Sequence, residues 1–196
     1  MEPVVIVTGR AVPLDRTDVD TDQIIPSDWL KRVERTGFGA GLFSEWRDDR
    51  NFVLNDEQYV GATILVAGHN FGTGSSREHA VWALMDFGFQ AVVSSRFADI
   101  FRNNSTKQGL LPVQVTEEFD RALLDAVLAD PTLEITIDVA RGTIEAPAAG
   151  LSAVFPLDEF TRERLLHGWD DIGLSLRHAD AIDQFERQRP AFLPSA

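Results

Sequence analysis

A strand, a glycine-rich loop and a helix are predicted in succession near residues 62–88, and this unit constrains the fold most. Residues 62–67 (ATILVA) form a short apolar run with β-branched members, which is typical of a buried strand. Three glycines follow within seven residues and predict a loop that turns sharply and can approach a ligand closely. Ser75 and Glu78 have capping-box spacing, so we expect a helix to begin there and to end at Gly88.

The flanking residues predict an α/β fold whose central sheet contains parallel strands and is flanked by helices. Residues 91–95 (AVVSS) read as a second buried strand, and two apolar strands joined by one helix form a parallel βαβ unit. Another helix begins at 97–101, and we expect it to give way to the polar run 103–107. Further strands are expected at 4–7, 10–12 (after a turn at 8–9), 109–113, 133–139, 143–146 and 154–157, and further helices at 29–33, 117–128, 159–166 and 179–188. A single domain over residues 1–188, with a frayed tail at 189–196, accommodates these elements.

The composition excludes several classes of function. A net charge of −13 argues against non-specific binding to nucleic acid and to anionic membranes. The chain has no cysteine, which rules out disulfides, thiol catalysis and any iron–sulfur cluster held by this chain alone. No apolar run approaches the roughly 20 residues of a membrane span, and the N-terminus lacks the basic-then-apolar pattern of a signal peptide. We therefore expect a cytoplasmic protein.

The start of the central helix carries a candidate anion site. Ser75, Ser76 and Arg77 stand together where the free N–H groups and the dipole of a helix N-terminus favour negative charge. Arg77 can hold a carboxylate through two hydrogen bonds. Either serine could bind the same carboxylate, or act as a base if N–H donors and Arg77 stabilise its alkoxide. A helix cap is by itself a sufficient explanation of Ser75, and spacing alone favours it, whereas two consecutive serines and an arginine after three glycines favour an anion site.

Two other chemistries fit this loop less well. A glycine-rich turn between strand and helix is also typical of dinucleotide binding, but residues 94–96 (SSR) stand where a ribose-binding acid is expected. A serine hydrolase needs Gly-x-Ser-x-Gly, and around Ser76 the final glycine is replaced by Glu78. A small nucleotide-binding or regulatory module therefore stays the alternative to carboxylate binding with acid–base chemistry.

An acidic segment precedes the central unit. Asp18, Asp20 and Asp22 alternate along the chain in a way that suggests a calcium loop. That loop also needs a glycine and a glutamate at the positions that Gln23 and Trp29 occupy. We therefore expect a solvated acidic turn and no metal site.

The histidines and the aromatic residues are expected to have structural roles. His69, His167 and His178 have no metal-ligand spacing with one another, so we expect them to be structural or exposed. Residues 36–52 form a long loop without a clear period, and its large apolar side chains argue against disorder. We expect Phe43 and Trp46 to lie in the core or in an interface.

Several segments resemble one known family. Residues 72–80 (GTGSSREHA) are similar to the signature of the swivelling domain of aconitase-type dehydratases. The chain also resembles the 3-isopropylmalate dehydratase small-subunit family of bacterial leucine biosynthesis. The similar segments occur in the same order as in that family and are residues 19–26 (VDTDQIIP), 35–39, 52–55, 82–84, 97–101 and 109–112. The resemblance runs from about residue 4 to 190 and implies a swivelling β/β/α domain of the aconitase type.

The resemblance implies a reaction shared between two subunits. In this family 2-isopropylmalate loses water to give isopropylmaleate, and water returns at the neighbouring carbon to give 3-isopropylmalate. Three cysteines of the large subunit hold a [4Fe–4S] cluster, and one iron stays open as a Lewis acid. The resemblance thus implies a hydro-lyase that binds a small dicarboxylate, holds no metal in this chain and is active only with its large subunit. The absence of cysteine agrees with that division.

The resemblance also implies roles for individual residues. Ser75 resembles the base that removes the proton next to a carboxylate, and Ser76 and Arg77 resemble carboxylate binders. Thr21 and Asp22 resemble part of a Thr-Asp-x-Ile segment that lies near the site in aconitases. Gly72 and Gly74 belong to the anion-binding loop. Many relatives have cysteine at the position of Thr73, which is not a ligand position, so we expect little consequence.

Residues 29–38 stand where small subunits of this family are thought to read the side group of the substrate. Leu30 and Val33 could contact an isopropyl group, whereas Lys31 and Arg32 could meet a third carboxylate. The small subunit of a related hydro-lyase, of the homoaconitase or citraconate type, is therefore the alternative within the family.

Overall fold

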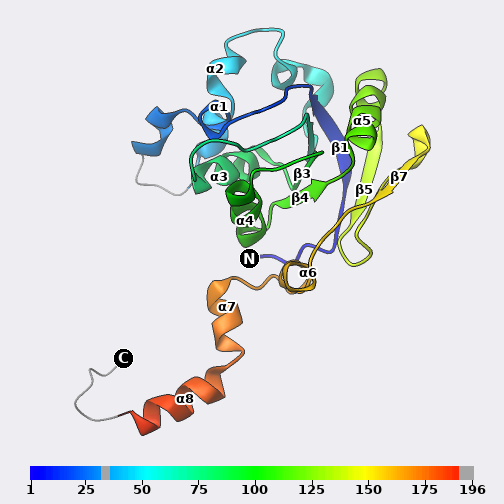
Figure 1. The fold of residues 1–196 in the computed structure, drawn as a ribbon. Helices are drawn as coiled ribbons and strands as arrows, with labels where there is room; N and C mark the ends of the chain where they lie inside the picture. The colour runs from blue at the N-terminus through cyan, green and yellow to red at the C-terminus, as the bar shows by residue number, and fades with distance from the viewer. Residues whose placement is uncertain (32–35, 190–196) are drawn as a thin grey trace.

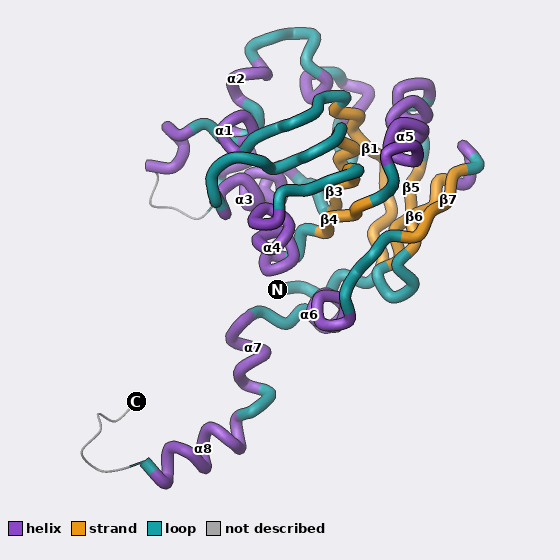
Figure 2. Tube along the Cα trace, in the orientation of Figure 1, coloured by secondary structure: helices purple, strands orange, loops and turns teal. Residues whose placement is uncertain are grey.

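The computed structural model describes residues 1–31 and 36–189, which fold around one mixed sheet with the strand order β4-β3-β2-β1-β5-β6-β7 (Figures 1 and 2). Strands β1 to β4 pair in parallel, and β5 to β7 extend the sheet with antiparallel pairs. The strands are β1 (Ile6–Leu14), β2 (Ile64–Ala67), β3 (Ala91–Ser94), β4 (Leu111–Gln114), β5 (Glu134–Asp138), β6 (Thr143–Ala146) and β7 (Leu151–Val154). The predicted α/β fold and the parallel β2–β3 pair are confirmed.

Strand β1 joins the two halves of the sheet. Its residues 6–10 pair with β5, and its residues 11–14 pair with β2. Two strands separated by a turn at Gly9 were predicted here, and that prediction is wrong. Gly9 lies within the strand opposite Ile135, and a Cβ on it would stand 2.2 Å from Thr63 Oγ1. The glycine therefore permits close packing beside Thr63 and does not make a turn.

Helices cover both faces of the sheet. Figure 1 shows α3 (Glu78–Phe87) and α4 (Asp99–Gln108) together on one side, and α5 (Glu117–Ala129) on the other. Every residue of β2 and β3 is buried, as expected for parallel strands covered on both faces. Gly88 ends α3 in the left-handed conformation with φ 118°, which confirms the predicted C-cap.

Helix α4 runs further than predicted. The polar run 103–107, where we expected the helix to give way, lies inside it. Two of its hydroxyl groups are buried and donate back to backbone carbonyl oxygens one turn earlier: Ser105 to Phe101 at 2.8 Å and Thr106 to Asn103 at 3.0 Å. These bonds satisfy the hydroxyls without interrupting the helix.

The long aromatic loop folds into short helices packed on the core. They are η2 (Phe38–Gly41), α2 (Ser44–Arg47), η3 (Val53–Asn55) and η4 (Glu57–Tyr59), preceded by α1 (Thr21–Ile24) and η1 (Ser27–Lys31). Phe43 is fully buried, and the Trp46 ring stacks on it with 5.2 Å between centroids. The predicted core role of both residues is confirmed.

The C-terminal helices leave the body of the molecule. After η5 (Pro147–Ala149) and β7 come α6 (Glu159–His167), α7 (Asp171–Leu176) and α8 (Ala179–Gln188), and Figure 1 shows α7 and α8 extending away from the sheet. None of the residues of α7 and α8 is buried. The predicted helix at 179–188 is confirmed, whereas the tail at 190–196 lies outside the described residues.

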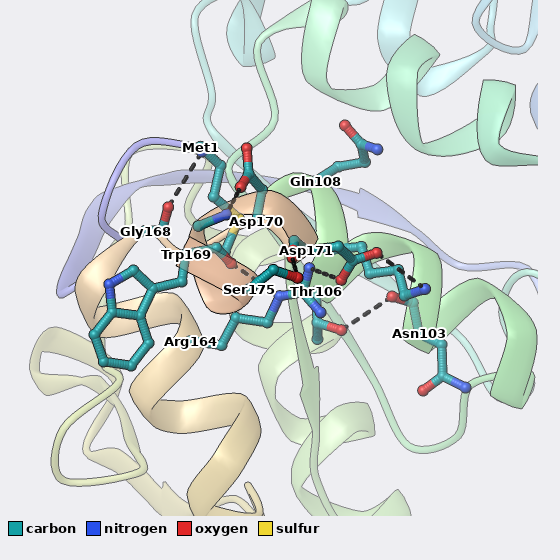
Figure 3. Close-up of polar contacts among 12 residues, drawn as sticks. Met1, Asn103, Thr106, Gln108, Arg164, Gly168, Trp169, Asp170, Asp171 and Ser175 are labelled. Carbon is teal, nitrogen blue, oxygen red and sulfur yellow. Dashed lines mark hydrogen bonds and ion pairs between the residues drawn. The ribbon is translucent and has the colours of Figure 1, made fainter. Parts of the chain in front are cut away.

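Arg164 anchors the beginning of α7 (Figure 3). Its side chain is buried, and it donates to the Trp169 carbonyl oxygen at 3.0 Å and to Asp171 Oδ1 at 2.8 Å. The N-terminal amine of Met1 donates to the Gly168 carbonyl oxygen at 3.2 Å. No helix within 1–31 and 36–189 is long and apolar enough to cross a membrane.

Candidate active site

The predicted site residues gather at the edge of the sheet where the parallel strands end. Residues 68–77, the glycine loop, follow β2, and the loops after β1 and β3 lie on either side of it. The carboxyl edge of parallel strands is the usual place for a ligand in α/β proteins. The structure therefore places the motif where chemistry is expected.

The segment after β1 is hydrogen-bonded along the glycine loop. The N–H groups of Gly72 and Thr73 donate to the Val19 carbonyl oxygen at 2.8 and 3.1 Å. In return Thr21 donates its N–H to the Thr73 carbonyl oxygen at 2.9 Å and its hydroxyl to the Ser75 carbonyl oxygen at 3.0 Å. The two predicted motifs, far apart in sequence, are thus held together as one unit.

Two glycines give the loop its shape. Gly72 and Gly74 have φ of 78° and 85°, which lie in the left-handed region that side chains disfavour. A Cβ on Gly72 would also stand 2.3 Å from Cγ of Phe101, so α4 can approach the loop only because this residue is glycine. The glycines of the predicted anion-binding loop are therefore required by backbone conformation and by packing.

The predicted capping box at Ser75 is wrong. Helix α3 begins at Glu78, its N-cap residue is Arg77, and no side chain caps it. The Glu78 carboxylate, which the box would need, accepts a hydrogen bond from Gln108 Nε2, and Ser75 lies two residues before the N-cap. Asp20 makes a capping box instead, with Gln23 at the start of α1.

Ser75 and Ser76 present unengaged polar groups to solvent. Both residues are exposed, and within the described part of the chain neither hydroxyl makes a hydrogen bond. The N–H groups of Ser75, Ser76 and Arg77 likewise donate to no acceptor among the described residues. Consecutive free N–H groups before an uncapped helix form an electropositive surface that can bind an anion.

Arg77 is paired with Asp22. Nη1 of Arg77 donates to Oδ1 of Asp22, so Asp22 lies beside the serine motif. The Arg77 side chain is 19% exposed and that of Asp22 is 55% exposed, so the carboxylate covers the guanidinium from the solvent side. A bound carboxylate ligand would meet the same guanidinium.

The acidic segment is exposed at Asp18 and Asp22, as expected for a solvated turn, and its carboxylates also make hydrogen bonds. Asp20 caps α1, and Asp18 accepts a hydrogen bond from Asn70 Nδ2 at 2.6 Å. Across residues 1–31 and 36–189, no three His, Asp or Glu side chains are grouped so that they could hold a metal ion.

Comparison with known proteins identifies the family. The Aconitase C-terminal domain family matches residues 1–118, and the family of the C-terminal domain of the 3-isopropylmalate dehydratase small subunit matches residues 171–194. A 3-isopropylmalate dehydratase small subunit of Frankia casuarinae is 65% identical over 196 residues, covering 100% of this chain and 99% of the relative. One of Rubrobacter xylanophilus is 56% identical and covers 99% of this chain and 98% of its own.

The chain belongs to the 3-isopropylmalate dehydratase small-subunit family. It is thus a subunit of an aconitase-type hydro-lyase. A crystal structure of 3-isopropylmalate dehydratase from Methanocaldococcus jannaschii superposes with a TM-score of 0.67 at 28% identity, over 91% of this chain and 99% of that one. The swivelling fold implied by the sequence is therefore confirmed.

The segment expected to read the substrate of this small subunit is described in part. Leu30 is half-buried in η1 and packs against the core. Lys31 is 80% exposed and pairs with Asp28 at 2.8 Å. Arg32 and Val33 lie outside the described residues.

One group near the site of this dehydratase subunit was missed by sequence reasoning. Asp120, in the first turn of α5, is buried at 3% exposure, and its Oδ2 accepts the Ser95 N–H at 3.1 Å. Burial raises the pKa of Asp120 to about 6. Ser95 Oγ lies 3.2 Å from Nδ1 of His69, the second residue of the glycine loop. Helical spacing could have predicted the burial of Asp120, because Asp120 lies on the apolar face of the helix with residues 123, 124 and 127.

Proposed function

We propose that this chain completes the active site of 3-isopropylmalate dehydratase by closing over a large subunit. The complex would isomerise 2-isopropylmalate to 3-isopropylmalate through isopropylmaleate, as a cytoplasmic step of leucine biosynthesis. The family, the fold and the docking of the Thr21–Asp22 segment against the serine loop all support this role.

Ser75 is the base of the proposed mechanism. Its oxygen takes the proton from the carbon next to a substrate carboxylate, while the hydroxyl leaves the neighbouring carbon. Rehydration returns the proton and the hydroxide with their positions exchanged. A serine hydroxyl is a weak base in water, so its alkoxide needs stabilisation. The free N–H groups at residues 75–77, the helix N-terminus and Arg77 offer that stabilisation.

Ser76 and Arg77 hold a substrate carboxylate in the proposed complex. Arg77 offers two parallel donors to a carboxylate, and Asp22 occupies part of this donor set in the free chain. Thr21 fixes the loop through the Ser75 carbonyl oxygen. Leu30 and its neighbours, including Lys31, would face the side group of the substrate.

The reaction also needs a Lewis acid for the leaving hydroxyl, which a [4Fe–4S] cluster on the large subunit would supply. This chain has no cysteine to hold such a cluster. The proposal therefore requires a heteromer whose site lies between the two subunits. The exposure of Ser75 and Ser76 on the free chain suits residues that become enclosed only in that complex.

The pairing of Asp22 with Arg77 beside the exposed Ser75 carries the proposal, and reconstitution tests it. The chain would be co-expressed with a cysteine-bearing large subunit of a relative and assayed anaerobically with 2-isopropylmalate and related hydroxy acids. Isomerisation of 2-isopropylmalate by the complex, and by neither subunit alone, is the expected result. A complex without hydro-lyase activity on any of these acids would contradict the proposal.

Two substitutions test the residue roles in that complex. Ser75→Ala should abolish turnover with little change in the free energy of unfolding, because Ser75 caps no helix. Arg77→Lys should raise KM markedly, because lysine cannot make the two-donor fork. Ser152→Ala and Arg141→Lys alter exposed residues of the β5–β7 half of the chain and serve as matched controls. Near-wild-type turnover of Ser75→Ala would refute the base assignment.

A further inference from the structure

Asp120 is an unusual residue for a helix that packs on a sheet. Helix α5 packs against β1, β2 and β3, and Asp120 is buried on that side. One carboxylate oxygen accepts the Ser95 N–H at 3.1 Å, and the other, Oδ1, has no hydrogen-bond partner among the described residues. A buried carboxylate with an unpaired oxygen destabilises a fold, so its presence beside a site indicates a functional role.

A chain of contacts runs from Asp120 to the residues proposed for catalysis. Ser95 connects Asp120 to His69, because its N–H reaches the carboxylate and its Oγ lies 3.2 Å from the His69 ring. The His69 carbonyl oxygen then accepts the N–H of Asp18 at 2.8 Å. His69 is the second residue of the glycine loop, and Asp18 precedes Asp22 in the segment after β1, so His69 links both halves of the site.

A second set of bonds ties the loop after β3 to the same region. Ser94 Oγ donates to the Gly68 carbonyl oxygen at 2.8 Å, and Phe71 donates its N–H to the Arg96 carbonyl oxygen at 2.9 Å. A displacement of Ser95 would therefore move the glycine loop, which cannot relax independently. Asp120 is the only side chain of α5 that bonds to the loop after β3 in the described part of the chain.

We propose that Asp120 is a positioning residue, which acts through Ser95 and His69 to hold the glycine loop in the conformation that presents Ser75 and Arg77. The inference rests on the function proposed above. Asp120 does not touch the substrate. Its ionised carboxylate binds the Ser95 N–H more strongly than a neutral group can.

The ionisation of Asp120 makes this positioning dependent on pH. Burial raises its pKa to about 6, while Ser95, Arg121 and His69 act in the opposite direction. Arg121 is itself held by Asp15 at 2.9 Å and by Asp125. As the pH falls through about 6, Asp120 takes up a proton, and the hydrogen bond from the Ser95 N–H to its carboxyl group weakens.

The test compares wild type with Asp120→Asn in the assembled enzyme across pH. Asparagine keeps the size and an acceptor oxygen but cannot ionise. We expect the ratio of wild-type to variant kcat to be about tenfold at about pH 8, the factor expected when one charge-assisted hydrogen bond becomes neutral. The ratio should fall toward one as the pH drops below about 6, because protonated Asp120 then resembles asparagine. Other titrating groups affect both proteins and cancel in the ratio.

Two further variants make the result decisive. Asp125→Asn changes an exposed carboxylate on the same helix and should keep wild-type kcat at every pH. Ser95→Ala keeps the N–H that donates to Asp120 but removes the hydroxyl, which contacts His69 and helps to lower the pKa of Asp120, so it should lower kcat toward the Asp120→Asn value. If Asp120→Asn does not fold, Ser95→Ala with wild-type kcat at every pH overturns the inference.

The outcomes separate this inference from the proposed function. A ratio that does not change with pH, whatever its size, would overturn the positioning role and leave the proposed function standing. An inactive wild-type complex would overturn the proposed function and the inference with it.

Discussion

Replacement of Asp120 by asparagine should stabilise the isolated chain increasingly as the pH rises. The pKa of Asp120 is raised from 3.8 to about 6 by burial. Each pKa unit corresponds to about 1.4 kcal/mol, so ionising Asp120 costs about 3 kcal/mol more in the folded chain than in the unfolded chain. Asparagine has nearly the same volume and carries no such cost.

The sign follows from the direction of the shift. Because the folded chain holds this proton more tightly than the unfolded chain, the contribution of Asp120 to stability is complete below pH 3.8 and is lost as the pH rises through about 6. About half of the loss, or about 1.4 kcal/mol, falls between about pH 5 and pH 8.

Urea denaturation of wild type and Asp120→Asn at several pH values between about 5 and 8 measures this effect. The difference in the free energy of unfolding between the two proteins should grow by about 1.4 kcal/mol across that range, in favour of the variant. The pair with Arg121 lowers the pKa of Asp125, so its stabilising contribution is present at all pH values above 3.8. The control Asp125→Asn should therefore differ from wild type by a constant amount from pH 5 to pH 8. A constant difference for Asp120→Asn as well would show that Asp120 does not ionise in this range, and would refute the reasoning.

Two further substitutions test the architecture of the site. Gly72→Ala should destabilise the chain by about 3 kcal/mol or more, because φ is 78° and the new Cβ would stand 2.3 Å from the Phe101 ring; an unchanged melting temperature would contradict the packing argument. Asp20→Ala removes the capping box of α1 and should cost about 1 kcal/mol, measured by chemical denaturation. Asp28 is exposed and pairs only with Lys31 in the described part of the chain, so the free energy of unfolding of the control Asp28→Ala should stay within about 0.5 kcal/mol of wild type. An equal loss of stability in Asp20→Ala and Asp28→Ala would argue against the cap.

Local sequence patterns predicted the elements whose signals are themselves local. The period of residues 117–128 predicted α5, and the alternation of 133–139 predicted β5. The glycine at 88 predicted the end of α3. In each case the spacing of apolar residues or the freedom of a glycine determines the conformation without help from distant residues.

The predictions failed where a distant partner decides the outcome. Ser75 and Glu78 have the spacing of a capping box, but the helix begins only at Glu78, whose carboxylate is bound by the distant Gln108. The polar residues 103–107 look like the end of a helix, yet Ser105 and Thr106 are buried by the packing of α4 and satisfy their hydroxyls within it. Local propensity is a weak preference that tertiary contacts override.

The sequence by itself determined the chemical inventory of this small subunit. The lack of cysteine places any iron–sulfur cluster on another chain, and the Gly72–Ala80 motif identified the family and the candidate base. Only the tertiary structure brought Asp22 to Arg77 across 55 residues and left the Ser75 hydroxyl exposed and not engaged in capping a helix. It also buried Asp120, whose carboxylate accepts the N–H of Ser95 after β3. Residue types and spacing specify what a side chain can do, whereas its pairing and its protonation depend on burial and on partners that only folding brings together.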